Sequence, residues 1–253
     1  MVIKILGTGT SQGIPVVACT CPVCLSKDIK DKRLRTAVLV ETLNNTWVID
    51  AGPDFRQQML RENIRKVDAI FITHNHKDHT GGLDDVRAFN WVLKKPMELF
   101  ARAAVIDSVI NDFSYAFEED KYPGVPQINL NNISNQPFEF NNDLIVPIDA
   151  MHSRMPVFGL RIGDFSYLTD ASYVSNDELD KMKGSKVIII NALRKQKHHS
   201  HFNLDEAIEI IRYLKPEKAY LTHISHQMGF HSEVNKELPE GIELAWDGLT
   251  IEI

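Results

Sequence analysis

Residues 72–82 read ITHNHKDHTGG, and they follow the short apolar run VDAIFIT at 67–73. The run predicts a buried strand, and the motif places His74, His76, Asp78 and His79 directly after it in an H-x-H-x-D-H pattern. A strand that ends in a tight turn can direct several such side chains into one cleft. Imidazole and carboxylate groups suit zinc, manganese or iron better than calcium. The stretch therefore predicts a transition-metal site at a strand end.

Three further candidate ligands stand at the ends of later predicted strands. His152 follows LIVPIDAM, Asp170 ends FSYLTD, and His223 lies in KAYLTHI. Taken singly, each could be an ordinary core or turn residue. Together with the four groups of the first motif they make seven, which is the set that two metal ions need if one carboxylate bridges them.

The three cysteines of the chain lie close together in ACTCPVC at residues 18–24. Cys19, Cys21 and Cys24 are spaced C-x-C-x-x-C, and an odd, tightly spaced set argues against the disulfide framework of a secreted protein. A closed structural zinc site needs four ligands, so a fourth is missing from this segment. Three reduced thiols without a metal remain the alternative.

Composition indicates a soluble globular protein. The hydrophobic fraction of 43% and the charged fraction of 25% over 253 residues are ordinary for that class, and no apolar run approaches the roughly 18 residues of a membrane span. The formal net charge of −6 argues against binding long nucleic acids. Because the chain shows no repeat, linker or leader-like segment, we expect one domain over 1–253, located in the cytoplasm and not at a membrane.

Strands and helices are mixed along the chain, with strand-rich segments at 2–50 and 143–192. Two mixed sheets packed face to face, with helices outside, satisfy this α/β (α+β) pattern, and residues 119–136 are expected to form a loop. The predicted strands are 2–6, 36–42, 46–50, 67–73, 97–101, 143–151, 158–163, 165–170, 186–192 and 218–224, and the main predicted helices are 55–65, 82–94, 103–118 and 204–216.

The order of these motifs resembles the metallo-β-lactamase-fold hydrolases: T-H-x-H-x-D-H after a strand, a lone His, T-D, and a late T-H. The resemblance covers nearly the whole chain and implies an αββα sandwich with the site at the sheet edges. Asp50, in VIDAG, would orient a metal ligand. The implied ligand sets are His74, His76 and His152 for one ion and Asp78, His79 and His223 for the other, with Asp170 bridging both.

Three segments point to one branch of these hydrolases: LGTGTSQGIPVVACTCPVC (6–24), SHFNLDEAI (200–208) and LTHISHQ (221–227). They resemble the phosphoribosyl 1,2-cyclic phosphate phosphodiesterases, the PhnP-like branch, and more loosely the tRNA 3′-processing endonucleases and the PqqB-type proteins. The resemblance implies that His201 is a general acid or a contact to the substrate phosphate, and that His226 completes a structural Cys₃His zinc site. A homodimer is compatible with it.

The expected function is therefore a dinuclear phosphodiesterase with Asp78 and His201 as catalytic residues. Its cofactors would be two divalent ions, zinc or manganese, and one structural zinc. A water between two such ions would lose a proton near neutral pH and become the nucleophile. The tRNA-processing enzymes carry a basic arm, whereas residues 115–135 here hold one lysine against three acids, which favours a small phosphodiester substrate.

Two other functions stay open at this point. One is a thioester or lactone hydrolase of the glyoxalase-like kind, and the other is a metal-binding biosynthesis accessory protein of the PqqB-like kind, without turnover. We expect three other histidines to be solvated, namely His198, His199 and His231. The basic residues nearest the expected site either contact a phosphate or form a solvated face, and they are Arg154, Arg194, Lys195 and Lys197.

Overall fold

The computed structural model of the protein describes all of residues 1–253 and contains two seven-stranded sheets. In the first sheet the strands lie in the order β14-β1-β2-β3-β4-β5-β6. Neighbours from β14 to β3 are antiparallel, and those from β3 to β6 are parallel. The strands of this sheet are β1 (Val2–Gly7), β2 (Ala37–Glu41), β3 (Thr46–Ile49), β4 (Ala69–Phe71), β5 (Met97–Ala101), β6 (Ile128–Asn132) and β14 (Thr250–Glu252).

The second sheet repeats this arrangement in the order β7-β8-β9-β10-β11-β12-β13. Pairs from β7 to β10 are antiparallel, and pairs from β10 to β13 are parallel. Its strands are β7 (Phe138–Phe140), β8 (Asp143–His152), β9 (Met155–Ile162), β10 (Phe165–Leu168), β11 (Val187–Asn191), β12 (Lys218–Thr222) and β13 (Ile242–Leu244).

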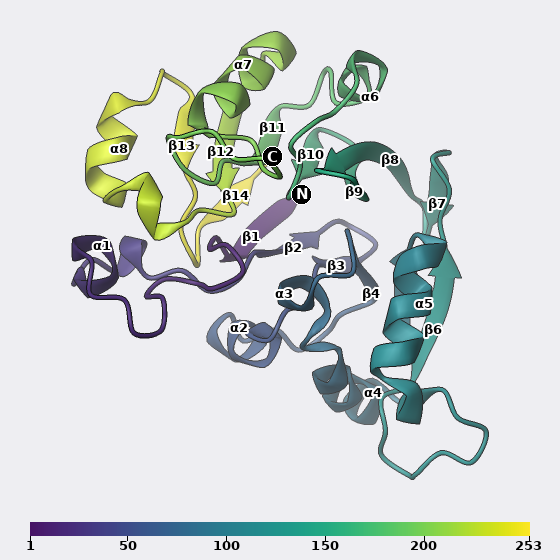
Figure 1. Ribbon diagram of the computed structural model, residues 1–253. Helices are drawn as coiled ribbons and strands as arrows, with labels where there is room; N and C mark the ends of the chain where they lie inside the picture. The colour runs from purple at the N-terminus through teal and green to yellow at the C-terminus, as the bar shows by residue number, and fades with distance from the viewer.

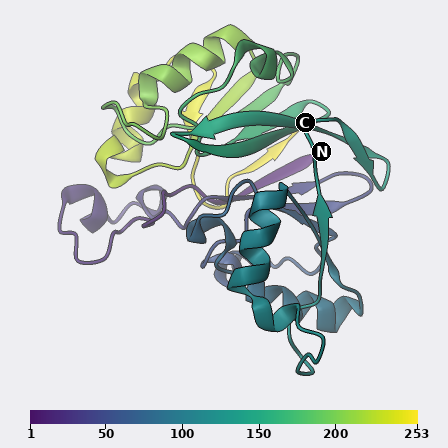
Figure 2. The same ribbon diagram turned by 45° about the vertical axis from the view of Figure 1, so that its right-hand side comes forward.

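Six helices lie on the two outer faces of the packed sheets, so that the molecule has four layers (Figures 1 and 2). One set, α2, α4 and α5, packs on the first sheet, and the other set, α6, α7 and α8, packs on the second. This confirms the predicted αββα sandwich. The α-helices are α1 (Pro22–Leu25), α2 (Phe55–Arg61), α3 (Lys77–Thr80), α4 (Val86–Leu93), α5 (Ala103–Asp112), α6 (Asn176–Asp180), α7 (Leu204–Leu214) and α8 (His231–Glu237). Four 3₁₀ turns complete the secondary structure: η1 (Ile29–Asp31), η2 (Leu83–Asp85), η3 (Ser114–Ala116) and η4 (His226–Met228).

Both faces of the central strands are buried. In β2, Val38 and Val40 join the core between the two sheets, while Ala37 and Leu39 join the core under the outer helices. Successive side chains of a strand point to opposite faces, and a strand covered on both faces reads as a continuous apolar run. This explains why the central strands show no alternation of polar and apolar residues in the sequence.

The strands that carry the predicted site residues end at one edge of the sandwich. Asp50 follows β3, Asp170 follows β10 and His223 follows β12, and all three have left-handed backbone conformations, with φ of 67°, 56° and 55°. Non-glycine residues rarely adopt this conformation, and such strain concentrates at functional sites. The backbone thus turns sharply at each point where a polar side chain enters the edge.

One predicted loop contains a strand. Residues 119–136 include β6, which pairs in parallel with β5 at the edge of the first sheet. The amides of Asn129 and Asn131 both donate to the carboxylate of Glu98 on β5, at 2.6 and 2.8 Å. An asparagine-rich sequence is typical of loops, but here cross-strand bonds to one glutamate satisfy its amides.

Helix boundaries differ from the expectation at three places, and one of them is the helix predicted over 55–65, which ends at Arg61. The helix predicted over 82–94 starts only at Val86, after the 3₁₀ turn η2, and the helix predicted over 103–118 ends at Asp112. The predicted cap of α7 is confirmed, because Asn203 and Glu206 form a reciprocal capping box. No helix combines the length and the apolarity needed to cross a membrane.

His231 is buried, which corrects the prediction that it lies on the surface. Its Nδ1 lies 3.2 Å from the guanidinium of Arg33, which is also buried and donates to the carbonyl of Ala245 at 2.6 Å. The backbone N–H of His231 donates to the carboxylate of Asp31 at 2.7 Å. The imidazole of His231 therefore accepts a hydrogen bond from the guanidinium of Arg33, which is always charged. This contact joins the start of α8 to the N-terminal segment.

Replacing His231 by asparagine should make thermal stability less sensitive to acid. Burial, reinforced by the charges of Arg33 and Lys30 and opposed by Asp31 and Asp28, lowers the pKa of His231 to about 4. Between about pH 6.5 and the folded value, the unfolded chain takes up a proton that the folded chain does not, so stability falls as the pH drops through this window. Asparagine keeps an acceptor but does not titrate. Melting temperatures measured by calorimetry across this pH window should fall less in the variant than in the wild type. If the melting temperatures of both proteins fell equally with pH, titration of His231 would not be the cause.

Candidate metal centre

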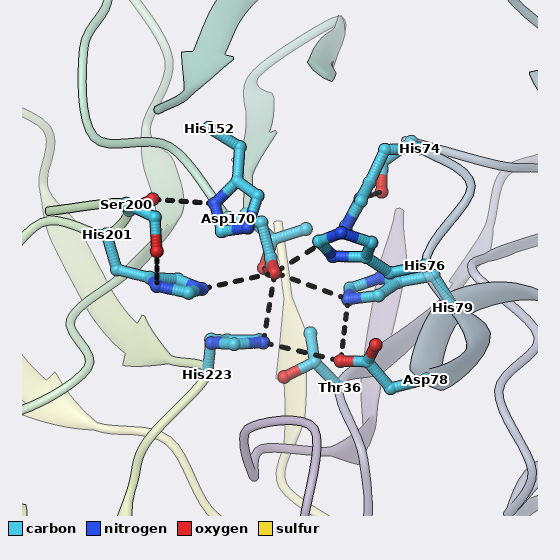
Figure 3. A network of polar contacts seen from close by, with 12 residues as sticks. Thr36, His74, His76, Asp78, His79, His152, Asp170, Ser200, His201 and His223 are labelled. Atoms are coloured by element: carbon cyan, nitrogen blue, oxygen red, sulfur yellow. Dashed lines mark hydrogen bonds and ion pairs between the residues drawn. The ribbon is translucent and has the colours of Figure 1, made fainter. Parts of the chain in front are cut away.

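The H-x-H-x-D-H motif turns the chain from β4 into α3, so that Asp78 and His79 lie in the single turn of that helix. The backbone N–H groups of His79 and Thr80 both donate to the carbonyl of His76, at 3.0 and 3.1 Å. His74 and His79 are fully buried, Asp78 is half-buried, and His76 is exposed. The turn brings the four side chains to the same side, where they face one another (Figure 3).

Asp170 lies at the centre of the constellation and is almost completely buried. One oxygen, Oδ2, faces four imidazoles, whereas the other, Oδ1, accepts a hydrogen bond from the Thr169 hydroxyl at 2.7 Å. The two oxygens therefore have separate surroundings. The distances from Oδ2 to the Nε2 atoms are 3.1 Å for His223, 3.3 Å for His201, 3.5 Å for His79 and 3.6 Å for His74.

Asp170 belongs to three sets of candidate donor atoms, and within each set the donor atoms lie within 4.8 Å of one another. Two sets match the two expected ions: Asp170 with Asp78, His79 and His223, and Asp170 with His74 and His76. The third set joins Asp170 to His152 and His201. His152 lies beside the second set, with its ring centroid 5.1 Å from that of His76 and 5.7 Å from that of His74. The structure thus brings together all seven groups that the sequence singled out.

The second ring nitrogens of two histidines are held by neighbouring groups. Asp50 lies 2.7 Å from Nδ1 of His79, and the carbonyl of Ser200 accepts from Nδ1 of His152 at 2.6 Å. The Thr73 hydroxyl lies 3.0 Å from both oxygens of Asp50. Such partners fix the ring orientation and leave Nε2 free for a metal. Asp50 therefore lies where it can orient a ligand, in agreement with the expected role.

These residues fit divalent metal ions. The Nε2 atoms of His74, His79 and His223 are buried and have no hydrogen-bond partner. Unpartnered polar atoms in a protein interior are rare and require an explanation. Imidazole nitrogens and carboxylate oxygens that converge in this way are typical ligands of zinc, manganese and iron.

The electrostatics of the cluster also suit cations. Burial alone would raise the pKa of Asp170, but the charges of His223 and His79 and the hydrogen bond with His201 hold it well below its usual range. Burial likewise opposes protonation of His223, yet Asp170 and Asp78 outweigh it and raise that pKa to about 9. Asp170 and Asp78 therefore stay ionised and draw positive charge to the site, which divalent ions would supply when bound.

His201 borders the centre, and its neighbourhood corrects one expectation. Its Nε2 lies 3.3 Å from Oδ2 of Asp170, and its Nδ1 lies 3.0 Å from the Ser200 hydroxyl and 3.3 Å from Nδ1 of His198. Burial lowers the pKa of His201 to about 4, against the effect of Asp170. His198 is therefore a half-buried neighbour of the site instead of a solvated residue, whereas His199 is exposed as expected.

Two of the four nearby basic residues are engaged elsewhere. Arg194 donates to the side chain of Gln227 at 2.6 Å, and Lys195 forms an ion pair with Glu237 at 2.6 Å. Arg154 is exposed and forms no hydrogen bond or ion pair through its side chain. Of these three, Arg154 alone is free to meet a phosphate.

The cysteine cluster closes around His226. A tetrahedral zinc with Zn–S of about 2.3 Å and Zn–N of about 2.05 Å would place each sulfur about 3.6 Å from the nitrogen. The observed separations fit that arrangement, and all four donor atoms lie within 4.8 Å of one another. The distances from Nδ1 of His226 are 3.4 Å to Sγ of Cys19, 3.3 Å to Sγ of Cys21 and 3.6 Å to Sγ of Cys24.

Backbone groups support this cluster. The N–H of Cys24 donates to Sγ of Cys21, and the N–H of Val16 donates to Sγ of Cys24, both at 3.4 Å. The first of these bonds lowers the pKa of Cys21 to about 6, helped by His226. Burial raises the pKa of Cys24 to about 11. Because His226 lies three residues after His223, the cluster connects the N-terminal segment to the strand end that carries a candidate ligand.

A family model described as the beta-lactamase superfamily domain matches residues 45–224, well over half of the chain. The chain belongs to the β-lactamase superfamily. The matched span begins just before β3 and ends one residue after His223, so it contains all seven groups of the centre. Membership of this superfamily and the two donor sets together indicate divalent metal binding.

A solved structure identifies the branch. The crystal structure of a diphosphatase from the PhnP family is 36% identical to this chain and superposes with a TM-score of 0.93, covering 100% of this chain and 97% of that one. Identity and coverage at this level place the chain in the PhnP family. This confirms the branch predicted from the N-terminal loop and the late LTHISHQ segment.

Curated relatives carry different names. An octanoyltransferase from Porphyromonas gingivalis is 38% identical over 248 residues, which cover 97% of this chain and 50% of that protein. A ribonuclease Z from Staphylococcus epidermidis is 27% identical over 161 residues, which cover 61% of this chain and 47% of that protein. The chain spans about half the length of these relatives, so their names describe longer proteins.

Sequence reasoning missed several residues that shape the centre. Thr73 stands directly before the first motif and contacts Asp50. The Thr-His pair at 73–74 could have indicated this role from the sequence. Ser200 acts on His152 through its main-chain carbonyl, which no side-chain pattern encodes. Asn191, at the end of β11, hydrogen-bonds the residue after Asp170 and gave no signal in the sequence.

Proposed function

We propose that the protein is a dinuclear metal-dependent phosphodiesterase acting on a small cyclic or nucleotide-like phosphodiester. The observation that carries this proposal is the pair of donor sets that share the single buried carboxylate of Asp170. The proposed ligands are His74, His76 and His152 for one ion and Asp78, His79 and His223 for the other, with Asp170 contributing to both.

The residues of the chain prepare this site before anything binds. Two divalent ions held there would polarise the phosphate oxygens and supply a nucleophile from water near neutral pH. Asp50 and the Ser200 carbonyl fix the rings of His79 and His152, so these ligand nitrogens need little reorganisation. Preorganised groups of this kind account for much of the rate enhancement in hydrolytic enzymes.

His201 is the proposed contact to the reacting phosphate. Its Nε2 approaches the same oxygen of Asp170 that faces the candidate ligands. From this position its neutral ring can donate a hydrogen bond to the substrate phosphate. The negative charge of a bound phosphate would raise the pKa of the ring and let it protonate the leaving oxygen. The Ser200 hydroxyl and His198 meet its Nδ1 and hold the ring toward the centre.

Replacing His201 by alanine should lower turnover of a phosphodiester by about 10²–10⁴-fold and leave the metal content unchanged. Steady-state kinetics and elemental analysis of the same preparation give the two readouts. His199→Ala, which removes an exposed neighbour in the same loop, is the matched control and should behave as the wild type. Loss of bound metal in the His201 variant would make it a ligand and contradict this role.

Two features support a small substrate. Residues 115–135 hold three acids and one lysine, and the chain has a net charge of −6. Neither favours a long polyanion, whose binding depends on neutralising several phosphates with basic side chains. Arg154, exposed and unpaired next to His152, offers a cation for one additional phosphate.

A diphosphate is the second candidate substrate. The PhnP-family protein that is 36% identical over the whole chain is named a diphosphatase. Hydrolysis of a phosphoanhydride and of a phosphodiester both replace an oxygen substituent on phosphorus, so the same dinuclear centre suits either reaction.

A substrate panel distinguishes these functions. The protein is loaded with Mn²⁺ or Zn²⁺ and assayed with bis-p-nitrophenyl phosphate, 2′,3′-cyclic nucleotides, phosphoribosyl cyclic phosphate, a dinucleoside diphosphate, and an octanoyl thioester. We expect metal-dependent hydrolysis of a cyclic phosphodiester, with the dinucleoside diphosphate as the alternative. Hydrolysis of the thioester alone would support an acyl-group hydrolase instead. Failure to hydrolyse any compound of the panel in any metal form would overturn the proposal and favour a non-catalytic accessory role.

A further inference from the structure

The side chain of Asn191 continues a strand pairing where the backbone leaves it. β10 and β11 pair in parallel over Phe165–Leu168, and the pairing then stops as Asp170 turns into a left-handed conformation. Beyond this point Oδ1 of Asn191 accepts from the N–H of Ala171 at 2.9 Å, and Nδ2 donates to the carbonyl of Ala171 at 3.0 Å. The amide thus holds the peptide units directly after Asp170.

The same carbonyl also holds the segment that carries His201. The N–H of Phe202, the residue after His201, donates to the carbonyl of Ala171 at 2.7 Å. On the other side, the N–H of Leu193 donates to the carbonyl of Phe202 at 3.0 Å. Ala171, Phe202 and the end of β11 therefore form a closed set of hydrogen bonds that fixes Asp170 and His201 relative to each other.

The backbone of Asn191 reaches a third segment of the centre. It pairs with Thr222 on β12, directly before His223, and the N–H of the next residue, Ala192, donates to the Thr222 carbonyl at 2.9 Å. Asn191 is itself fully buried, and its side-chain bonds go to backbone atoms, not to a candidate ligand. It therefore acts on the centre only through the segments that it holds.

We propose that Asn191 is a positioning residue. It fixes Asp170 and His201 relative to each other and thereby determines how tightly the centre binds its metal ions. The role of His201 rests on the proposed function, whereas the effect on metal binding does not. This role requires a side-chain amide, because its oxygen can accept from the N–H of Ala171 while its NH₂ group donates to the carbonyl of the same residue. An apolar side chain of the same size would leave the buried N–H of Ala171 without a partner and the Ala171 carbonyl with only the N–H of Phe202.

Asn45 provides a matched control for the structural part of this effect. It is also a buried asparagine, and its amide donates to the carbonyl of Phe140 at 3.3 Å and to Asp143 at 2.6 Å and accepts from Asn141 at 2.8 Å. It precedes β3, whereas the metal centre lies at the other end of that strand. Loss of its bonds should destabilise the fold without reaching the centre.

The test compares Asn191→Leu with Asn45→Leu and with the wild-type protein. Mild chelation removes the ions of the dinuclear centre, and Zn²⁺ is titrated back by calorimetry, with melting temperatures recorded in the absence of added metal. We expect Asn191→Leu to weaken Zn²⁺ binding by about 10–100-fold, the usual effect of losing a partner outside the ligand shell. Asn45→Leu should lower the melting temperature and bind Zn²⁺ as the wild type does.

Two results would overturn the proposal. Wild-type Zn²⁺ affinity in Asn191→Leu would show that the asparagine stabilises the fold only. Equal losses of affinity in the two variants would show that metal binding follows general stability. Neither readout uses a substrate, so a wild-type protein that hydrolyses no phosphate compound would refute the proposed function without affecting this result.

Discussion

Replacing Asp170 by asparagine should remove at least one tightly bound metal ion and lower phosphodiester turnover by about a thousandfold or more. One oxygen of Asp170 is the shared neighbour of four imidazole nitrogens at 3.1–3.6 Å. Without its charge, both donor sets lose their common anion. A metal contributes several kcal/mol of transition-state stabilisation, and each 1.36 kcal/mol corresponds to about a tenfold change in rate.

Asparagine tests the role of the Asp170 charge more specifically than alanine does. Asp170 has φ of 56°, which asparagine tolerates better than alanine, so the variant removes the charge and keeps the turn. Asp164→Asn is the control, because Asp164 is an acid paired with Lys186 in an exposed turn and lies away from the centre. Full metal content and full turnover in Asp170→Asn would refute a centre built on a shared carboxylate.

Replacing Cys24 by serine should release one zinc per chain and cause a large loss of stability. A ligand present at a thousandfold excess over its dissociation constant stabilises the folded state by about 4 kcal/mol. For a chain of this size each kcal/mol corresponds to roughly 2–4 °C in melting temperature, so a fall of about 8–16 °C is expected. In the wild type this zinc should survive mild chelation that removes the ions of the dinuclear centre.

The neighbouring Val17 provides the control for this experiment. Its side chain is 91% exposed in the same loop, so Val17→Ser should keep both the zinc and the melting temperature. His226→Ala should reproduce the loss seen with Cys24→Ser, because both remove a corner of the same tetrahedron. If His226→Ala kept the full zinc content and the wild-type melting temperature, the Cys₃His assignment would be wrong.

The sequence was most informative where function concentrates unusual residues. The H-x-H-x-D-H motif after an apolar run located the centre, since few folds place three histidines and an aspartate at one strand end. Asp170 and His223 follow strands of the parallel part of the second sheet, whereas His152 ends β8 in its antiparallel part. The two strand-rich segments at 2–50 and 143–192 also predicted the two-sheet architecture.

Features that depend on distant contacts were not predictable. β6 reads as a loop because its asparagines are satisfied only by Glu98 on the neighbouring strand. His231 is buried because Arg33, far away in the sequence, needs an acceptor. The hydrogen bonds between Asn191 and Ala171 likewise form where β10 and β11 diverge, and no periodicity in the sequence marks this point.

Metal titration coupled to phosphodiester hydrolysis tests the central claim most directly. The protein is first stripped of the ions of the dinuclear centre with its cysteine-bound zinc retained, and Mn²⁺ or Zn²⁺ is then added while bound metal and turnover are measured together. A dinuclear centre predicts little activity up to one added equivalent per chain and a plateau at two. Full turnover at one equivalent, turnover without added metal, or no turnover at any loading would contradict it.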